Sequence, residues 1–180
     1  MKRKIQIGIM GSAADLKYSK QAETFAKELG RLIAQDNNIL VYGAEKDCCS
    51  LSTISAKEAK DCGGITVGIT YGKEKTCWNY EDFCPTILLP SGLERGGGRE
   101  FVLVLSCDVI IALGGGSGTL NEMVVAYQAG IPIVVASKFD GWAKDLCDKY
   151  IDSRKRLMCI SAGTPQEAYE KAVKLVNKLY

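Results

Sequence analysis

One glycine-rich stretch has the composition of an anion-binding loop. Residues 114–119 read Gly-Gly-Gly-Ser-Gly-Thr and lie between an apolar run, residues 109–113, and a helical pattern. A strand that leads directly into a helix lets several backbone N–H groups converge on a phosphate, with the positive end of the helix dipole behind them. The candidates for this contact are Gly115, Gly116, Ser117, Gly118 and Thr119. The same glycines suit a tight turn that needs positive φ angles, and their number favours neither interpretation.

Two charged residues near this loop could act on a bound phosphate ester. Glu122 lies one helical turn inside the loop, where its carboxylate would face a sugar or base attached to the phosphate. It also completes a capping box with Thr119, in which it would serve only the helix end. Arg99 follows the glycines at 96–98 and could clamp a phosphate, a carboxylate or a leaving base through its planar guanidinium, or lie solvated at the surface.

The composition excludes several other kinds of chemistry. The 180 residues include no histidine, which removes Ser-His-Asp and Cys-His hydrolases and two-His metal sites. The eight cysteines form no CxxC pair, so we expect no metal site. Adjacent Cys48 and Cys49 leave a redox or soft-metal role open. A net charge of +2 gives no basic footprint for nucleic acid, and we expect none as a partner.

The order of apolar runs predicts the scaffold that positions these residues. Short, nearly continuous apolar runs are typical of strands buried on both faces of a parallel sheet, and they alternate with helical patterns. The expected strands are residues 5–10, 39–42, 65–69, 86–89, 109–113 and 131–136, and the expected helices are residues 16–35, 51–62, 99–106 and 119–129. A final helix begins after Thr164, whose capping box includes Glu167. We therefore expect a doubly wound, Rossmann-like α/β sheet with helices on both faces.

The chain shows no internal boundary, and we expect residues 1–180 to form one domain. No run of residues is long and apolar enough for a membrane helix, and we expect a cytoplasmic protein without a membrane partner. In such a sheet ligands bind beyond the carboxyl ends of the strands, which adds Gly11, Ser12 and Gly43 as candidate ligand-binding residues. Residues 70–85 form the longest irregular stretch, either a functional lid or a surface excursion.

Residues 113–122, LGGGSGTLNE, resemble the PGGxGTxxE motif of the cytokinin-activating phosphoribohydrolases, a family long labelled lysine decarboxylase-like. Arg99 stands fifteen residues before Gly114, and CDVIIAL fills the intervening strand, as in that family. The resemblance implies a Rossmann-like homodimer that cleaves a nucleoside 5'-monophosphate into free base and ribose 5-phosphate. It makes Arg99 and Glu122 the catalytic pair, Gly115 to Thr119 the phosphate site, and a cofactor unnecessary for hydrolysis.

The chain also departs from the hydrolase pattern. Gly114 replaces the motif's proline, and Glu45 and Asp47 follow the second strand, where they would repel a nearby phosphate. Three other features are more similar to a sister branch, the molybdenum cofactor carrier-like proteins. They are the GGG form of the motif, the segment YIDSRKR and the closing TPQEA helix. That branch implies a non-catalytic carrier or sensor that binds a phosphorylated pterin, molybdopterin, or a nucleotide. The resemblance implies a homo-oligomer, a homodimer or larger, that binds a small phosphorylated ligand, and it leaves open whether the protein is an enzyme.

Overall fold

A single parallel sheet organises the chain. The structure is a computed structural model that describes residues 3–13 and 16–179, and within these residues seven strands form one sheet. The strands are β1 (Gln6–Gly11), β2 (Ile39–Gly43), β3 (Ile65–Thr70), β4 (Ile87–Pro90), β5 (Val109–Leu113), β6 (Ile133–Ala136) and β7 (Cys159–Ala162). The helices are α1 (Lys20–Gln35), α2 (Leu51–Asp61), α3 (Arg99–Leu105), α4 (Ser117–Ala129), α5 (Trp142–Asp145) and α6 (Pro165–Asn177).

The strand order places a switch in direction between β1 and β5. The sheet runs β4-β3-β2-β1-β5-β6-β7, and each neighbouring pair is parallel. The chain adds β2, β3 and β4 on one side of β1, then crosses to β5 on the other side. Loops that leave β1 and β5 therefore diverge, which opens a crevice at the carboxyl end of these two strands.

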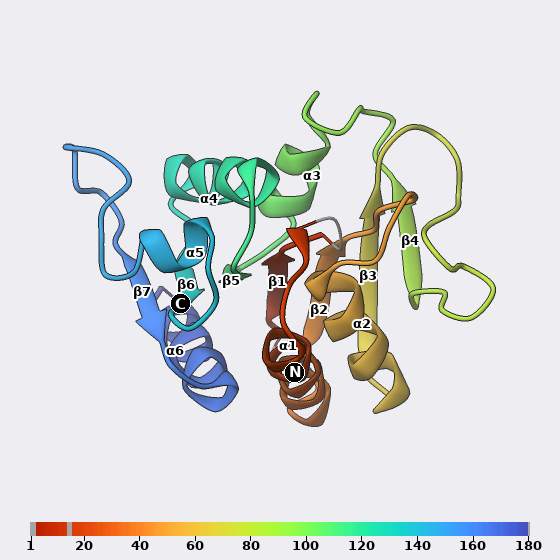
Figure 1. Ribbon diagram of the computed structural model, residues 1–180, viewed down its shortest axis with the longest axis horizontal. Coiled ribbons are helices and arrows are strands. Elements are labelled where there is room, and N and C mark those ends of the chain that lie inside the picture. The colour runs from red at the N-terminus through yellow and green to blue at the C-terminus, as the bar shows by residue number, and fades with distance from the viewer. Residues whose placement is uncertain (1–2, 14–15, 180) are drawn as a thin grey trace.

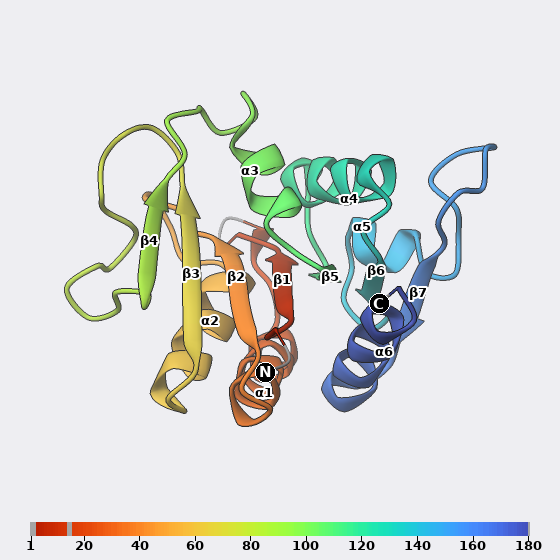
Figure 2. The ribbon, with the colours of Figure 1, turned by 180° about the vertical axis from the view of Figure 1, so that it is seen from behind.

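Helices cover both faces of the sheet. α1, α2 and α6 pack on one face, where their apolar residues join alternate residues of the strands, such as Ile7 and Ile9 of β1. α3, α4 and α5 pack on the other face, against residues such as Met10, Ile110 and Ala112. Figures 1 and 2 show α3 and α4 side by side and separate from α1 and α6. The expected doubly wound Rossmann-like fold is confirmed.

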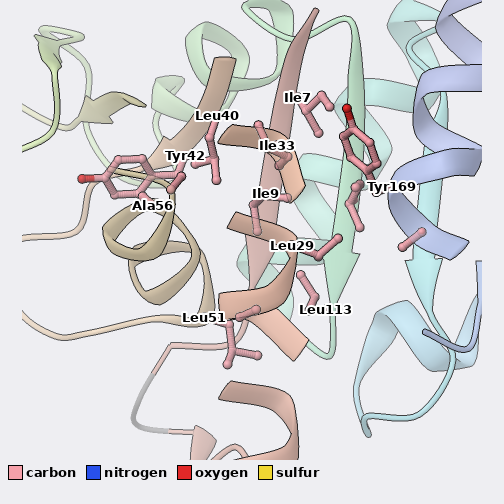
Figure 3. Packing of buried hydrophobic residues seen from close by; sticks show 14 of the residues in the cluster. Ile7, Ile9, Leu29, Ile33, Leu40, Tyr42, Leu51, Ala56, Leu113 and Tyr169 are labelled. Atoms are coloured by element: carbon pink, nitrogen blue, oxygen red, sulfur yellow. The ribbon is translucent and has the colours of Figure 1, made fainter. Parts of the chain in front are cut away.

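The core on the α1 side explains why the strands are apolar throughout. Ile7, Ile9, Leu29 and Leu113 have no solvent exposure, and Figure 3 shows their side chains meeting between β1, β5 and α1. Tyr42 lies in the same cluster and packs beside Phe83 of the loop between β3 and β4, with ring centroids 6.2 Å apart. That loop, which includes most of residues 70–85, is thus anchored to the core beside β2.

The bounds predicted from the sequence lie within a few residues of the observed bounds for most helices and strands, and two elements were not predicted. α1 begins at Lys20, not near residue 16, because the Ser19 hydroxyl accepts a 3.2 Å hydrogen bond from the Ala22 N–H and caps the helix there. The four-residue strand β7 and helix α5 were not expected. β7 has only two buried residues, and α5 is a single turn, so neither produces a periodic pattern.

Candidate functional site

A cavity of about 460 Å³ lies beyond the carboxyl ends of β1, β2 and β5. Gly11 and Leu113, the last residues of β1 and β5, are paired in the sheet, so the cavity opens at the switch between these strands. We call it the site cavity. Segments far apart in the sequence line it: the turn after β1, the segment after β2, residues 95–100 and the first turns of α4.

The N-terminus of α4 forms one wall of the site cavity. Gly116 is the N-cap residue and has no side chain to cap the helix, which contains 13 residues. Within the described chain the N–H groups of Ser117, Gly118 and Thr119 have no hydrogen-bond partner. All three residues line the cavity. Unpaired N–H groups at the positive end of a helix dipole are suited to bind an anion.

The turn before α4 is held by Ser12. Gly114 and Gly115 have φ angles of 59° and 90°, and a side chain at Gly115 would collide with Thr119. The Ser12 hydroxyl accepts a 2.7 Å hydrogen bond from the Gly115 N–H. Ser12 and Gly115 are therefore occupied with each other and line a neighbouring cavity instead of the site cavity. Both interpretations of the glycine-rich stretch therefore apply, each to a different part of it. Gly114 and Gly115 form the tight turn, and the residues after them present N–H groups to the site cavity.

Arg99, the first residue of α3, is buried in the opposite wall with 3% exposure. Its Nη2 donates a 2.6 Å hydrogen bond to Oε1 of Glu45, and its Nη1 donates to the backbone oxygen of Ile69 at 3.5 Å. The guanidinium lies against the backbone of Gly43, where a side chain would collide with it. Gly43 is thus needed for the close approach of Arg99; it does not line the site cavity but a small void of about 40 Å³ that Glu45 and Glu122 also line.

Glu45 joins Arg99 to a second arginine that the sequence analysis did not identify. Oε2 of Glu45 lies 3.1 Å from Nη1 of Arg95, whose Nη2 lies 3.5 Å from Asp47. The Arg95 guanidinium also lies 5.6 Å from the centre of the Tyr71 ring. The two carboxylates that were expected to repel a phosphate are therefore neutralised by arginine. In the sequence, the signal for Arg95 was its position four residues before Arg99, in the loop that leads into α3.

Glu100 completes the surroundings of Arg99. Its Oε1 accepts a 3.0 Å hydrogen bond from the Gly96 N–H and lies 3.5 Å from Arg99 Nε. Arg99 Nε and Glu100 Oε2 are buried polar atoms without a hydrogen-bond partner in the part of the chain that is described. Such atoms commonly contact a bound water or ligand. Burial opposes the charge of Arg99, yet the carboxyl groups of Glu45, Glu122 and Glu100 outweigh it and raise the pKa of Arg99.

Glu122 faces the site cavity and does not cap a helix. α4 begins at Ser117, so Thr119 is its third residue and cannot be an N-cap; the expected capping box is wrong. The side chain of Glu122 is 8% exposed and forms no hydrogen bond with any residue that is described. Burial raises the pKa of Glu122 to about 8, with Glu45 and Glu100 adding to the shift and Arg99 opposing it. Near neutral pH this carboxyl group is therefore mostly protonated.

The predicted site residues thus fall into two groups. The site cavity brings together Gly11, Arg99, Gly116, Ser117, Gly118, Thr119 and Glu122. Ser12 and Gly115 support the turn, and Gly43 supports Arg99. Adjacent Cys48 and Cys49 do not line the cavity. No helix in residues 3–13 and 16–179 has the length and apolar character needed to cross a membrane.

Comparisons with known proteins find chains of similar sequence and fold. An uncharacterized protein of Archaeoglobus fulgidus is 29% identical over 126 residues, which cover 70% of this chain and 76% of that protein. The molybdenum cofactor binding protein of Rippkaea orientalis superposes with a TM-score of 0.79 at 24% identity, covering 98% of this chain and 99% of the other. The molybdenum cofactor carrier protein of Chlamydomonas reinhardtii gives a TM-score of 0.78 at 27% identity over the same shares.

One family model matches nearly the whole chain. The SLOG cluster4 family model matches residues 4–169, a range that includes every candidate site residue named above. This match and the structural neighbours confirm the resemblance to the lysine decarboxylase-like superfamily and its carrier-like branch. On this evidence the chain belongs to the SLOG cluster4 family.

Proposed function

We propose that this chain binds a phosphorylated pterin in the site cavity and carries it without cleaving it. The molybdenum cofactor is the compound suggested by the names of the similar proteins from Rippkaea orientalis and Chlamydomonas reinhardtii. The observation that carries the proposal is the open N-terminus of α4, whose unpaired N–H groups line a cavity large enough for a small heteroaromatic phosphate ester.

The phosphate would bind at the first turn of α4. Ser117, Gly118 and Thr119 each offer an N–H group, and Ser117 and Thr119 add hydroxyl groups. Arg99 is less available for this role, because Glu45 accepts a hydrogen bond from its Nη2 and Ile69 accepts one from its Nη1. The helix end therefore presents more unpaired donors to an anion than Arg99 does.

Three carboxyl groups of the site cavity suit the ring of a pterin. The carboxyl groups of Glu45, Glu100 and Glu122 line the cavity, and a pterin presents amino and ring N–H donors to such acceptors. A protonated Glu122 can both donate and accept a hydrogen bond. No group of three or more metal-ligating side chains occurs in the described residues, so a molybdenum cargo would be held through its organic part.

Hydrolysis of a nucleoside 5'-monophosphate is the second candidate. Arg99 and Glu122 line one cavity at the spacing of the phosphoribohydrolases, and Arg99 favours the ionised form of Glu122. Cleavage of the glycosidic bond needs an ionised carboxylate to stabilise the positive charge that develops on the ribose. A pKa of about 8 leaves Glu122 mostly neutral near pH 7, which favours binding over cleavage.

Two measurements on the purified protein test the proposal. The first is titration with 6-hydroxymethylpterin phosphate, followed by pterin fluorescence, with Glu122→Gln as a variant that keeps the shape of the neutral side chain. The second is an assay for ribose 5-phosphate after incubation with a panel of nucleoside monophosphates. Pterin phosphate binding without ribose 5-phosphate supports a carrier. Release of ribose 5-phosphate that disappears in Glu122→Gln would establish the hydrolase instead.

The expected homo-oligomer and the cytoplasmic location also stand as proposals. Their support is the resemblance to the phosphoribohydrolases and the composition of the chain. Light scattering coupled to size-exclusion chromatography measures the oligomeric state. Fractionation of cells that express the tagged chain measures its location.

A further inference from the structure

A second cavity of about 500 Å³ lies next to the site cavity, and the proposed function does not use it. We call it the neighbouring cavity. Its walls come from residues 16–22, the Gly115–Gly116 turn and residues 138–141. Leu16 and Gly116 line both cavities, so the two cavities adjoin at these residues.

The two cavities adjoin beside the N-terminus of α4, because Gly116 lines both of them. Gly116 is the N-cap residue, directly before the unpaired N–H groups of Ser117 and Gly118. A phosphate bound by those groups would lie at the edge of the site cavity nearest the neighbouring cavity. A side chain at Gly116 would approach Leu16 to 3.2 Å, so glycine keeps the space between the two cavities open.

The charged groups of the neighbouring cavity favour an anion. Lys17 and Lys138 line it, both are exposed, and neither forms an ion pair with a described residue. Among the described residues of its wall one is acidic, Asp140, which lies 2.7 Å from Lys144 and is neutralised by it. Two lysines without a carboxylate partner create a local positive potential that attracts a phosphate group.

Apolar and aromatic side chains line another part of the neighbouring cavity. Leu51 is fully buried, and Phe139 packs edge-on against Phe25 with ring centroids 5.3 Å apart. A rigid aromatic side chain beside lysines suits a planar base attached to a phosphate, because the base can pack on the ring while the lysines hold the charge.

We propose that the neighbouring cavity is a subsite for a second phosphate and its nucleoside. The ligand class is then a pyrophosphate-linked nucleotide ester, with one phosphate at α4, the second near Lys17 and Lys138, and the base beside Phe139. This inference rests on the proposed function, which places the first phosphate at α4. To that function it adds a second binding site and a preference for pyrophosphate-linked ligands over monophosphates.

The test compares two ligands on the same protein by titration calorimetry: 6-hydroxymethylpterin phosphate and the same pterin joined through a pyrophosphate to guanosine. The wild-type chain binds the pyrophosphate-linked ligand more tightly. The variant Lys17→Ala/Lys138→Ala lowers that affinity about fivefold to twentyfold, the range for two exposed charge pairs, and leaves the affinity for the monophosphate unchanged. The control Lys27→Ala/Lys73→Ala removes two exposed lysines that line neither cavity and changes neither affinity.

The outcomes separate the two proposals. Equal affinity of the wild-type chain for both ligands, or an equal loss for both in Lys17→Ala/Lys138→Ala, would overturn the subsite and leave the carrier function intact. Failure of the wild-type chain to bind either ligand would overturn the proposed function, and the subsite with it. Circular dichroism spectra show that each variant is folded before its affinities are compared.

Discussion

Arg99 Nη2 donates a 2.6 Å hydrogen bond to Oε1 of Glu45, a residue 54 positions earlier in the chain. This contact joins the start of α3 to the segment after β2 in one wall of the site cavity. Arg99 is 3% exposed, and the Glu45 side chain is 13% exposed, so the pair is largely removed from water. A buried ion pair contributes less through attraction than through the penalty of leaving one partner alone.

Replacement of Arg99 by alanine should therefore destabilise the fold strongly. It leaves the carboxyl groups of Glu45 and Glu100 without their buried cation, and we expect a loss of about 3–5 kcal/mol in the free energy of unfolding. Arg95→Ala is the matched control, because Arg95 contacts the same Glu45 but its side chain is 54% exposed; we expect about 1 kcal/mol or less. Urea denaturation of both variants measures the difference, and equal losses would show that burial is not decisive here.

A methyl group at Gly43 should displace Arg99. A Cβ atom at this position would collide with Nη1 of Arg99, and the surrounding wall leaves the guanidinium little room to move. We expect Gly43→Ala to cost about 1–3 kcal/mol in unfolding free energy, as overpacked sites do, and to weaken ligand binding. At Gly118 a Cβ atom meets no atom of residues 3–13 or 16–179 within 4 Å beyond its own helix backbone and chain neighbours. Gly118→Ala should leave stability unchanged or raise it, and a loss comparable to that of Gly43→Ala would contradict this view of the wall.

Removal of the Ser12 hydroxyl should loosen the turn before α4. Ser12→Ala leaves the buried N–H of Gly115 without its 2.7 Å acceptor, and we expect a cost of about 1–3 kcal/mol. Ser117→Ala is the comparison, because Ser117 is exposed and its hydroxyl has no partner among residues 3–13 and 16–179. That change should alter stability by less than about 0.5 kcal/mol. Thermal unfolding distinguishes them, and no effect of Ser12→Ala would show that another group supports the turn.

Glu122 should make the fold less stable as pH rises. Its pKa is raised from 4.5 to about 8 in the folded chain, so the folded state holds a proton that the unfolded state releases. The contribution of neutral Glu122 is fully present below pH 4.5 and is lost progressively up to pH 8. The glutamine in Glu122→Gln cannot ionise. At pH 9 we expect the free energy of unfolding of this variant to be higher than that of the wild type by on the order of 2 kcal/mol. Urea denaturation of both proteins from pH 5 to pH 9 measures this, and parallel profiles would contradict the shift.

The sequence predicted the fold and part of the site for a simple reason. Strands buried on both faces are apolar along their whole length, and the loops after parallel strands meet at one edge of the sheet. These rules bring Arg99 and Glu122 to the cavity beside α4 without any knowledge of side-chain contacts. The motif resemblance identified the same two residues.

The remaining features depend on contacts between distant segments. Glu45 reaches Arg99 and Arg95 only because β2 ends and α3 begins at the same edge of the sheet, and no local sequence pattern indicates that contact. The Thr119 and Glu122 spacing fits a capping box, yet α4 begins two residues before Thr119, since Gly116 takes the N-cap position. The burial that raises the pKa of Glu122 likewise arises from packing around the whole cavity.

The affinity for a pterin with and without its phosphate tests the central claim most directly. Fluorescence titration of the wild-type chain with 6-hydroxymethylpterin and with its phosphate ester gives both dissociation constants under one set of conditions. The open end of α4 predicts that the phosphate ester binds at least about tenfold more tightly, the equivalent of one or two charge-assisted hydrogen bonds. It also predicts an unchanged pterin phosphate after prolonged incubation. Equal affinity for the two compounds, or no binding of the ester, would contradict the account.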